Sequence, residues 1–327
     1  MSKGQDDLQQ RFDNAESIHW DESFALREAP DFDTLPALDR KLYNKLPSDI
    51  GNTERLVTRY GKNLAFVKTS GWFAWDKKRW SLDDGDKYAY LFAEKTARDL
   101  KGEAIAMRAA GPYQDETPKQ FQERIKKFQR FALNSGNKTK INAMVDQAKC
   151  HLWQKPDIFD QNKNLFNVQN GTLNLEAEDN GEENFDGIVL QKHNRKDFIT
   201  KVANVQYDPN APQPQNFLNF IHDILPDDEI RNFMQRFCGY CLTGDTSESI
   251  VAMFWGGGSN GKSTLIDIID YILGDYAMTT PFGTVLQGDK GSKGGGDATP
   301  DLARLPGARF VSAAEPDTGA RLSEGAV

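Results

Sequence analysis

The chain has 327 residues, which is enough for two domains of ordinary size that each bury a core. Apolar residues make up 38% of the sequence and charged residues 27%, as in soluble globular proteins, and no run reaches the roughly eighteen apolar residues of a membrane span. The start, MSKGQDD, lacks the apolar core of a signal peptide, so we expect a cytoplasmic protein with no membrane partner.

The net charge of −8 would by itself disfavour a nucleic-acid partner, but the acidic residues are concentrated in two segments. Residues 1–33 hold nine acidic and three basic side chains, and residues 176–186 hold six acidic and no basic ones. Each segment therefore carries a net charge of −6, and the remaining residues carry +4. We expect a mildly basic body and interpret residues 1–35 as an acidic, mostly disordered leader.

The N-terminal region predicts a short helix followed by a hairpin rich in tryptophan. Leu56 and Val57 suit the inward face of a helix, and strands are expected around Phe66 and over 72–75, with a turn at 76–79. The three tryptophans at positions 72, 75 and 80 could stack on nucleic-acid bases. A hairpin that buries them as aromatic anchors is the interpretation we favour.

Residues 119–140 predict an amphipathic helix with a basic outer face. Seven lysines and arginines stand in this stretch against Glu123 alone, while Phe121, Ile125, Phe128 and Ala132 recur at helical spacing. Such a face could follow the phosphates of a nucleic acid or could be an ordinary solvated surface. The sequence leaves both open.

The second half of the chain begins with a pattern that is typical of short strands joined by tight turns. Residues 156–208 alternate short apolar runs with Asn-Gly and Asp-Gly pairs, and the Pro-rich stretch 208–215 is the best candidate for a domain boundary. Two helices are expected over 217–242. We therefore predict a leader over 1–35, an N-terminal domain over 36–212 and a second domain over 213–327.

Cys238 and Cys241 have the Cys-x-x-Cys spacing of redox sites, but they follow a stretch with helical periodicity. They therefore fall at the C-terminal end of a helix, where the helix dipole disfavours a thiolate. A zinc site would need a second pair of ligands, which His222 alone does not supply. We expect both thiols to be reduced and to pack in the interior.

The strongest motif is the run FWGGGSNGKST at 254–264, which satisfies the phosphate-binding pattern Gly-x4-Gly-Lys-Ser. An apolar run of strand length precedes it over 250–255, a helical stripe follows over 264–273, and Gly274 is a plausible C-terminal cap. Glycines allow backbone N–H groups to surround a phosphate at the positive pole of the helix. Lys262 can reach the β and γ phosphates, and the Ser263 hydroxyl is the expected Mg²⁺ ligand.

A short strand is expected over 310–314, and it delivers Glu315 at its end. Parallel strands of phosphate-loop proteins place such an acid beside the loop, where it completes the magnesium shell and polarises water. We expect a flexible loop over 288–300, ahead of this strand.

Several stretches together resemble the superfamily-3 helicase motor of phage and plasmid primases, a family related to the poxvirus primase-helicase. The motor stretches are GGGSNGKST, LGDYA at 273–277, and DLARLPGARFVSAAEPDTGARLSEGAV. The region ahead of the motor is matched by GNTERLVTRYG, GWFAWDKKRW, FDQNKNLFNVQNGTLNL, ITKVANVQYD and FCGYCLTG. The resemblance covers roughly residues 45–327.

This resemblance implies an α+β N-terminal region followed by an incomplete α/β P-loop NTPase of AAA+-like type. It implies an ATP-driven, ring-forming, hexameric helicase that acts on single-stranded or forked DNA in the replication of a phage, plasmid or integrated element within a bacterial host. Lys262 and Glu315 would be catalytic, and Ser263 and Glu315 would bind Mg²⁺. The residues that would bind ATP are Gly256, Gly257, Gly258, Ser259, Asn260, Gly261, Lys262, Ser263 and Thr264.

The chain departs from the family pattern in two respects. The family motor continues beyond the equivalent of Val327, so we expect a C-terminally truncated motor with weak or no turnover by itself. There is no catalytic primase domain, because the acids of DFD at 31–33 stand in too short a leader. A small-molecule P-loop kinase and a nucleotide- or DNA-binding module without turnover remain alternatives.

Overall fold

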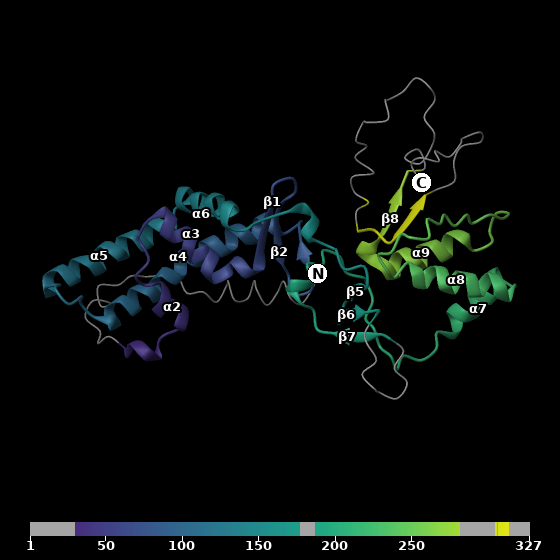
Figure 1. Ribbon diagram of the computed structural model, residues 1–327, viewed down its shortest axis with the longest axis horizontal. Coiled ribbons are helices and arrows are strands. Elements are labelled where there is room, and N and C mark those ends of the chain that lie inside the picture. Colours follow the sequence, from purple (N-terminus) through teal and green to yellow (C-terminus); the bar gives the residue numbers. More distant parts are fainter. Residues whose placement is uncertain (1–29, 177–186, 282–304, 306, 314–327) are drawn as a thin grey trace, which may run out of the picture. The chain divides into compact units, whose positions relative to one another are not determined.

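The computed structural model describes residues 30–176, 187–281, 305 and 307–313 (Figure 1). Residues 1–29 of the expected leader, nearly all of the acidic segment 176–186 and the glycine-rich stretch 288–300 lie outside the described residues. The chain divides into two compact units. The first holds the described residues up to Asp76 together with Trp80–Ile158, and the second holds Lys77–Arg79 and the described residues from Phe159 onward.

The first unit packs helices against a small mixed sheet. Its four strands lie in the order β3-β2-β1-β4, with β1 antiparallel to β2 and parallel to β4. The strands are β1 (Leu64–Val67), β2 (Gly71–Trp75), β3 (Trp80–Ser81) and β4 (Trp153–Gln154). The helices are η2 (Phe32–Thr34), α2 (Ala37–Leu42), α3 (Asp49–Tyr60), η3 (Gly61–Asn63), α4 (Gly85–Ala110), α5 (Pro118–Ser135), α6 (Lys138–His151) and η4 (Pro156–Ile158).

Two apolar cores hold this unit together. Leu56 of α3, Trp72 of β2 and Met144 of α6 belong to one core, which confirms the inward face expected for the helix that contains Leu56. Leu100 of α4 and Phe128 of α5 belong to the other. The long helix α4 contributes to both cores, and Figure 1 shows α3, α4 and α6 running alongside one another.

The predicted tryptophan hairpin is confirmed. Trp75 of β2 pairs with Trp80 of β3 in antiparallel register, and the turn lies at residues 76–79. Trp72 and Trp80 are almost fully buried. Buried rings cannot stack on nucleic-acid bases, so the anchor interpretation holds for these two tryptophans.

The basic stretch 119–140 was expected to form one helix, and this is wrong. Helix α5 ends at Ser135, and α6 begins at Lys138 after an N-cap at Asn137. The extended backbone of Asn137 (ψ 144°) interrupts the helix, because asparagine favours an N-cap over a helix interior. The expected apolar stripe is nevertheless confirmed, with Ile125 and Phe128 buried on the inner face of α5.

The second unit contains a three-stranded antiparallel sheet and a two-stranded parallel sheet. The antiparallel strands are β5 (Leu165–Val168), β6 (Gly171–Asn174) and β7 (Val189–Gln191), and the parallel ones are β8 (Ala277–Thr280) and β9 (Phe310–Ala313). The helices are η5 (Arg195–Asp197), α7 (Gln215–Ile224), α8 (Asp228–Tyr240), α9 (Lys262–Leu273) and η6 (Gly274–Tyr276). The helix pair expected over 217–242 is thus confirmed.

The division between the units differs from the boundary expected between residues 212 and 213. Phe166 and Leu173 of the antiparallel sheet share one core with Leu265 and Ile269 of α9. Because this core draws on residues from both sides of the Pro-rich stretch, the compact unit begins near residue 159. The stretch itself connects two parts of the same unit.

The strand expected over 250–255 is not formed, since these residues join no sheet in the described part of the chain. The burial pattern still alternates with a period of two. Phe254 packs against the core of the unit, whereas Met253 and Trp255 are 80% and 94% exposed. A strand requires a hydrogen-bonded neighbour as well as a pattern, and the described residues bring none alongside this segment.

The cysteine pair lies at the C-terminal end of α8, as expected, and both thiols are free. Burial raises the pKa of the Cys241 thiol to about 11, with a smaller contribution from Cys238. Such a thiol is protonated at neutral pH, which disfavours redox chemistry.

Among the described residues, none of the helices has the length and apolar character needed to span a bilayer.

Candidate functional site: a glycine-rich loop at the start of a helix

The loop at 256–261 has an unusual backbone. Gly256, Ser259 and Gly261 all have positive φ angles, of 156°, 57° and 82°. Positive φ angles in a loop of this kind can turn backbone N–H groups towards a bound anion. Ser259 adopts a left-handed conformation that costs a non-glycine residue free energy, and such strain is common where a loop binds a ligand.

Two glycines of the loop have positive φ angles that favour glycine, and a side chain at either would also crowd a neighbouring side chain. A Cβ atom on Gly256 would lie 2.3 Å from Nδ2 of Asn260, and one on Gly261 would lie 2.6 Å from Cγ2 of Ile224. Gly257 and Gly258 differ, since a Cβ on either would meet nothing within 4 Å. Their backbones therefore face open space that a ligand can approach closely.

Lys262, the first residue of α9, folds back over this loop. Its Nζ donates hydrogen bonds to the carbonyl oxygen of Gly256 and to Oδ1 of Asn260, both at 2.9 Å, and lies 3.4 Å from the carbonyl oxygen of Gly257. Within the described part of the chain, the oxygens that accept hydrogen bonds from this ammonium group are neutral. A phosphate would offer it a charged acceptor and a stronger hydrogen bond.

Helix α9 brings its N-terminus to the same place. Leu265, Ile269 and Leu273 are buried and anchor the helix, and Gly274 ends it at a φ of 55°, which confirms the expected cap. Gly261, the N-cap residue, has no side chain with which to cap this N-terminus, so N–H groups of the first turn can bind an anion. The chain therefore brings together three features that favour a phosphate: a glycine-rich loop with positive φ angles, a lysine and a helix N-terminus.

The residues expected to hold a metal are only partly described. Ser263 and Thr264 are exposed in the first turn of α9, where the Ser263 hydroxyl is accessible to a hydrated Mg²⁺ ion. Glu315 lies outside the described residues, two positions beyond the end of β9. The described residues contain no cluster of three or more potential ligands, so a Mg²⁺ ion here would rely on the phosphates and water for most of its ligands.

The strand that leads to Glu315 is held firmly at its start. Arg309 donates hydrogen bonds to the backbone carbonyl oxygens of Leu165 and Leu242, and its guanidinium lies 4.7 Å from the centre of the Tyr276 ring. Burial lowers the pKa of Arg309. The contacts of this half-buried arginine were not predicted from the sequence, because a single arginine ahead of a strand carries no local signature of its partners.

Asp270 is a second residue that the sequence did not single out. It lies on α9 at the parallel strands, with Oδ2 3.5 Å from Oγ of Ser312 and a buried Oδ1 that has no hydrogen-bond partner among the described residues. Burial raises the pKa of this carboxyl group. The signal in the sequence was a carboxylate within an otherwise apolar helical stripe.

The family model that matches this chain covers a region ahead of the glycine-rich loop. Residues 53–226 match the family described as "D5 N terminal like". "Putative helicase L207/L206" of Acanthamoeba polyphaga mimivirus is 24% identical over 270 residues, which are 80% of this chain and 27% of that protein. "Putative primase C962R" of African swine fever virus (isolate Warthog/Namibia/Wart80/1980) is 24% identical over 179 residues, and "Putative helicase 121R" of Invertebrate iridescent virus 3 is 27% identical over 124 residues.

The alignments cover 53% of this chain and 18% of the African swine fever virus protein, and 36% of this chain and 12% of the iridescent virus protein. The aligned part of the chain thus spans about a quarter or less of the length of these relatives. The relatives share names that refer to helicases and primases, and the family match covers just over half of the chain. The chain belongs to the D5 N terminal like family and is related to viral primase-helicase proteins.

Proposed function

We propose that this chain is an ATP-dependent motor subunit of a superfamily-3 DNA helicase that serves the replication of a phage, plasmid or integrated element. The observation that carries the proposal is the position of Lys262, whose ammonium group lies within hydrogen-bonding distance of the glycine-rich loop at the start of α9. The helicase and primase names of the relatives supply the DNA-replication context. ATP and Mg²⁺ are the proposed ligands, and DNA is the proposed partner.

The roles of the side chains follow from their chemistry. Lys262 would leave its carbonyl partners and bind the β and γ phosphates, while the N–H groups of the loop and first turn would bind the remaining phosphate oxygens. Ser263 would bind Mg²⁺ through its hydroxyl oxygen. Glu315 would polarise the attacking water and assist in holding the metal.

Assembly into a ring is part of the proposal. In motors of this kind an arginine from a neighbouring subunit stabilises the charge of the transferring phosphoryl group, and such an arginine is worth about 10³ to 10⁵ in rate. We therefore expect ATP binding by the isolated chain and little hydrolysis before subunits associate. A hexamer is the oligomer implied by the resemblance.

The first test measures ATP binding by calorimetry in the presence of Mg²⁺. Lys262→Ala removes charge-assisted hydrogen bonds worth about 1.5–3 kcal/mol, so affinity should fall by roughly 10- to 100-fold. Lys196→Ala is the matched control, because Lys196 is an exposed lysine of the same unit. Equal affinity of the Lys262→Ala variant and the wild type would contradict the proposed nucleotide site.

A second test separates a helicase motor from other nucleotide-binding proteins. ATP hydrolysis is measured with and without single-stranded DNA at protein concentrations that favour association. The rate of ATP hydrolysis by a helicase motor should rise when DNA is added. The Glu315→Gln variant should still bind ATP but should no longer hydrolyse it. Hydrolysis that is indifferent to DNA would favour a small-molecule kinase, and binding without any hydrolysis would favour a binding module.

A further inference from the structure

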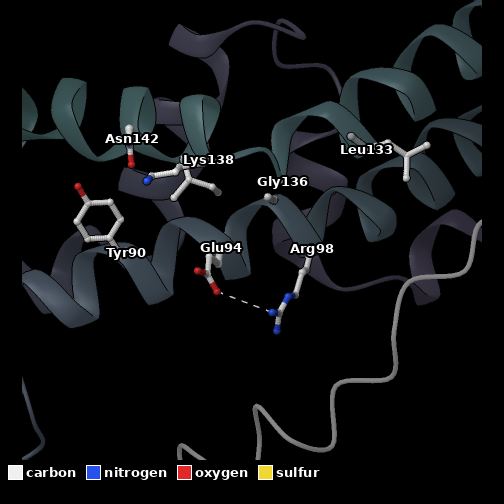
Figure 2. Close-up of a pocket in the computed structure, with 10 residues that line it drawn as sticks. Tyr90, Glu94, Arg98, Leu133, Gly136, Lys138 and Asn142 are labelled. Carbon is white, nitrogen blue, oxygen red and sulfur yellow. Dashed lines mark ion pairs between the residues drawn. The ribbon is translucent and has the colours of Figure 1, made fainter.

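The first unit contains a surface cavity of about 700 Å³ between α4, the end of α5 and the start of α6. Figure 2 shows Tyr90, Glu94 and Arg98 along one wall, all from α4. Leu133, Lys138 and Asn142 line the opposite side. Of the described residues assigned to ATP or Mg²⁺, none lines this cavity.

The walls combine the groups that bind a nucleotide of a single strand. Tyr90 is 42% exposed and offers an aromatic face, and Leu133 adds exposed apolar surface. The amide of Asn142 can donate and accept hydrogen bonds at the edge of a base. Stacking on an aromatic ring is tolerant of sequence because every base has a π face.

The charges of the cavity favour a phosphate. The guanidinium of Arg98 lies 3.8 Å from the carboxylate of Glu94, so the charges of these two side chains largely cancel. Lys138, in contrast, has no ion-pair partner within the described part of the chain. Lys138 is also the first residue of α6, whose N-cap Asn137 makes no side-chain hydrogen bond to the helix. The positive end of the helix dipole and the lysine charge therefore act at the same wall.

A basic stripe extends from the cavity along α5. Arg130 and Lys126 precede Leu133 by three and seven positions, so the three side chains share one face of the helix. Both cations are exposed, and neither has an ion-pair partner among the described residues. The sugar-phosphate backbone of a strand that enters the cavity would thus continue past the positive charges of Arg130 and Lys126.

We infer that this cavity and the stripe of Lys126 and Arg130 form a binding site for single-stranded DNA, with one base stacked on Tyr90 and its phosphate bound near Lys138. The inference deepens the proposed function, because it assigns to one unit the DNA contact that a helicase requires. It does not depend on ATP, since the residues of the phosphate loop belong to the other unit. Of the two interpretations of the basic face that the sequence left open, it adopts the one in which that face follows the phosphates.

The test is fluorescence anisotropy of a labelled oligo-dT strand with the full chain in the absence of nucleotide. Tyr90→Ala should weaken binding by roughly 5- to 150-fold, which corresponds to the loss of one stacked base, while Tyr90→Phe should retain it. Tyr271→Ala is the matched control, because Tyr271 is an exposed tyrosine on α9 in the other unit. Unlabelled dTMP should compete only at far higher concentration than oligo-dT if a strand is the true ligand.

The phosphate contacts are tested through salt dependence. Lys138→Gln and Arg130→Gln should each reduce the slope of log K against log salt by about 0.7, as expected for one lost phosphate contact on a single strand. Lys62→Gln, at an exposed lysine of the same unit, should leave the slope unchanged. Circular dichroism of every variant checks that the fold is retained.

The outcomes separate this inference from the proposed nucleotide site. Wild-type affinity of folded Tyr90→Ala and Lys138→Gln variants, or absence of oligo-dT binding by the wild type, would overturn the inference. Equal competition by dTMP and oligo-dT would show a mononucleotide site and would overturn it as well. Lys262→Ala should bind oligo-dT as the wild type does, so loss of ATP binding and loss of DNA binding are distinguishable.

Discussion

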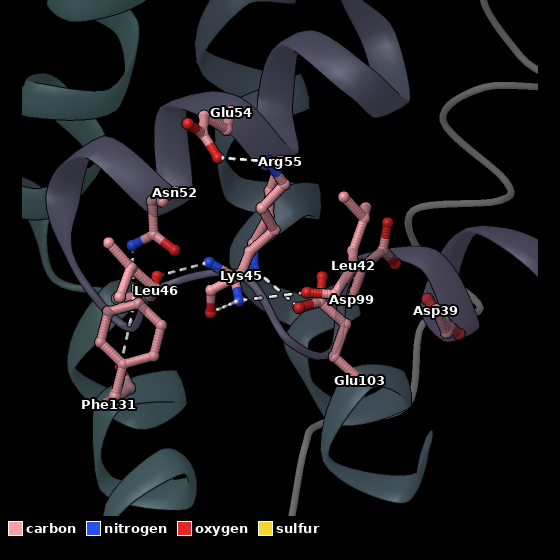
Figure 3. A network of polar contacts seen from close by, with 12 residues as sticks. Asp39, Leu42, Lys45, Leu46, Asn52, Glu54, Arg55, Asp99, Glu103 and Phe131 are labelled. Carbon is pink, nitrogen blue, oxygen red and sulfur yellow. Dashed lines mark hydrogen bonds and ion pairs between the residues drawn. The ribbon is translucent and has the colours of Figure 1, made fainter. Parts of the chain in front are cut away.

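Glu103 is well suited to a stability test, because it and Arg55 form a fully buried ion pair (Figure 3). Both side chains have an exposed fraction of 0%, and Nε of Arg55 lies 2.6 Å from Oε2 of Glu103. The other carboxylate oxygen of Glu103 accepts a hydrogen bond from Arg59 at 3.0 Å. One carboxylate thus faces two guanidinium groups.

The Glu103→Gln substitution keeps the shape of this side chain and removes its charge. Arg55 would retain hydrogen bonds to the carbonyl oxygens of Lys45 and Leu46, at 2.8 and 2.9 Å, but these neutral groups do not balance its charge. Arg59 would keep its ion pair with Asp39, whose carboxylate oxygen lies 2.6 Å from the Arg59 guanidinium. Removal of one partner of a buried ion pair costs about 3–5 kcal/mol, and we expect a loss in this range.

The assay is urea unfolding of the full chain, followed by tryptophan fluorescence. Trp72 and Trp80 are buried in the first unit and report its unfolding, whereas Trp153 and Trp255 are exposed already. With a urea dependence of about 1–3 kcal/mol per molar, the expected loss lowers the midpoint by at least about 1 M.

Glu54→Gln is the matched control for this experiment. Glu54 forms an ion pair with Lys45 at 2.7 Å, but both side chains are about 40% exposed, so the midpoint should hardly change. If Glu103→Gln shifts the midpoint no more than Glu54→Gln does, the buried charge is not stabilised as described. The reasoning would then be wrong for this network.

Three further results are expected. Gly85→Ala should lower the melting temperature clearly, because its Cβ would lie 1.7 Å from the carbonyl oxygen of Trp72, whereas Gly136→Ala should be neutral, since its Cβ would lie no closer than 3.6 Å to any atom. Cys150 is exposed and should react with iodoacetamide in the native state at pH 8, whereas the buried Cys241 should react only on unfolding, as mass spectrometry of labelled peptides can show. Burial raises the pKa of the Cys241 thiol to about 11, against about 8.5 in an unfolded chain. The contribution of this thiol to stability is therefore present below about pH 8.5 and is lost as the pH rises towards 11. Cys241→Ala should accordingly flatten the decline of the melting temperature at alkaline pH.

The sequence by itself determined the local features of this protein. The spacing of Gly256, Gly261 and Lys262 predicted the loop and its helix, because the conformations that glycine permits and the reach of a lysine act over a few residues. The apolar periods likewise predicted the hairpin around Trp72 and the buried face of α5. These elements depend on neighbours along the chain, and the structure contains them.

Only the tertiary structure decided what depends on residues far apart in the sequence. The pairing of β8 with β9, the hydrogen bond from Arg309 to Leu165 and the shared core of Phe166 and Leu265 all join segments separated by tens of residues. The same holds for the cavity between Tyr90 and Lys138 and for the missing strand at 250–255. A periodic pattern states which face of an element is buried, but the partner against which it is buried is set by the free energy of the whole packed unit.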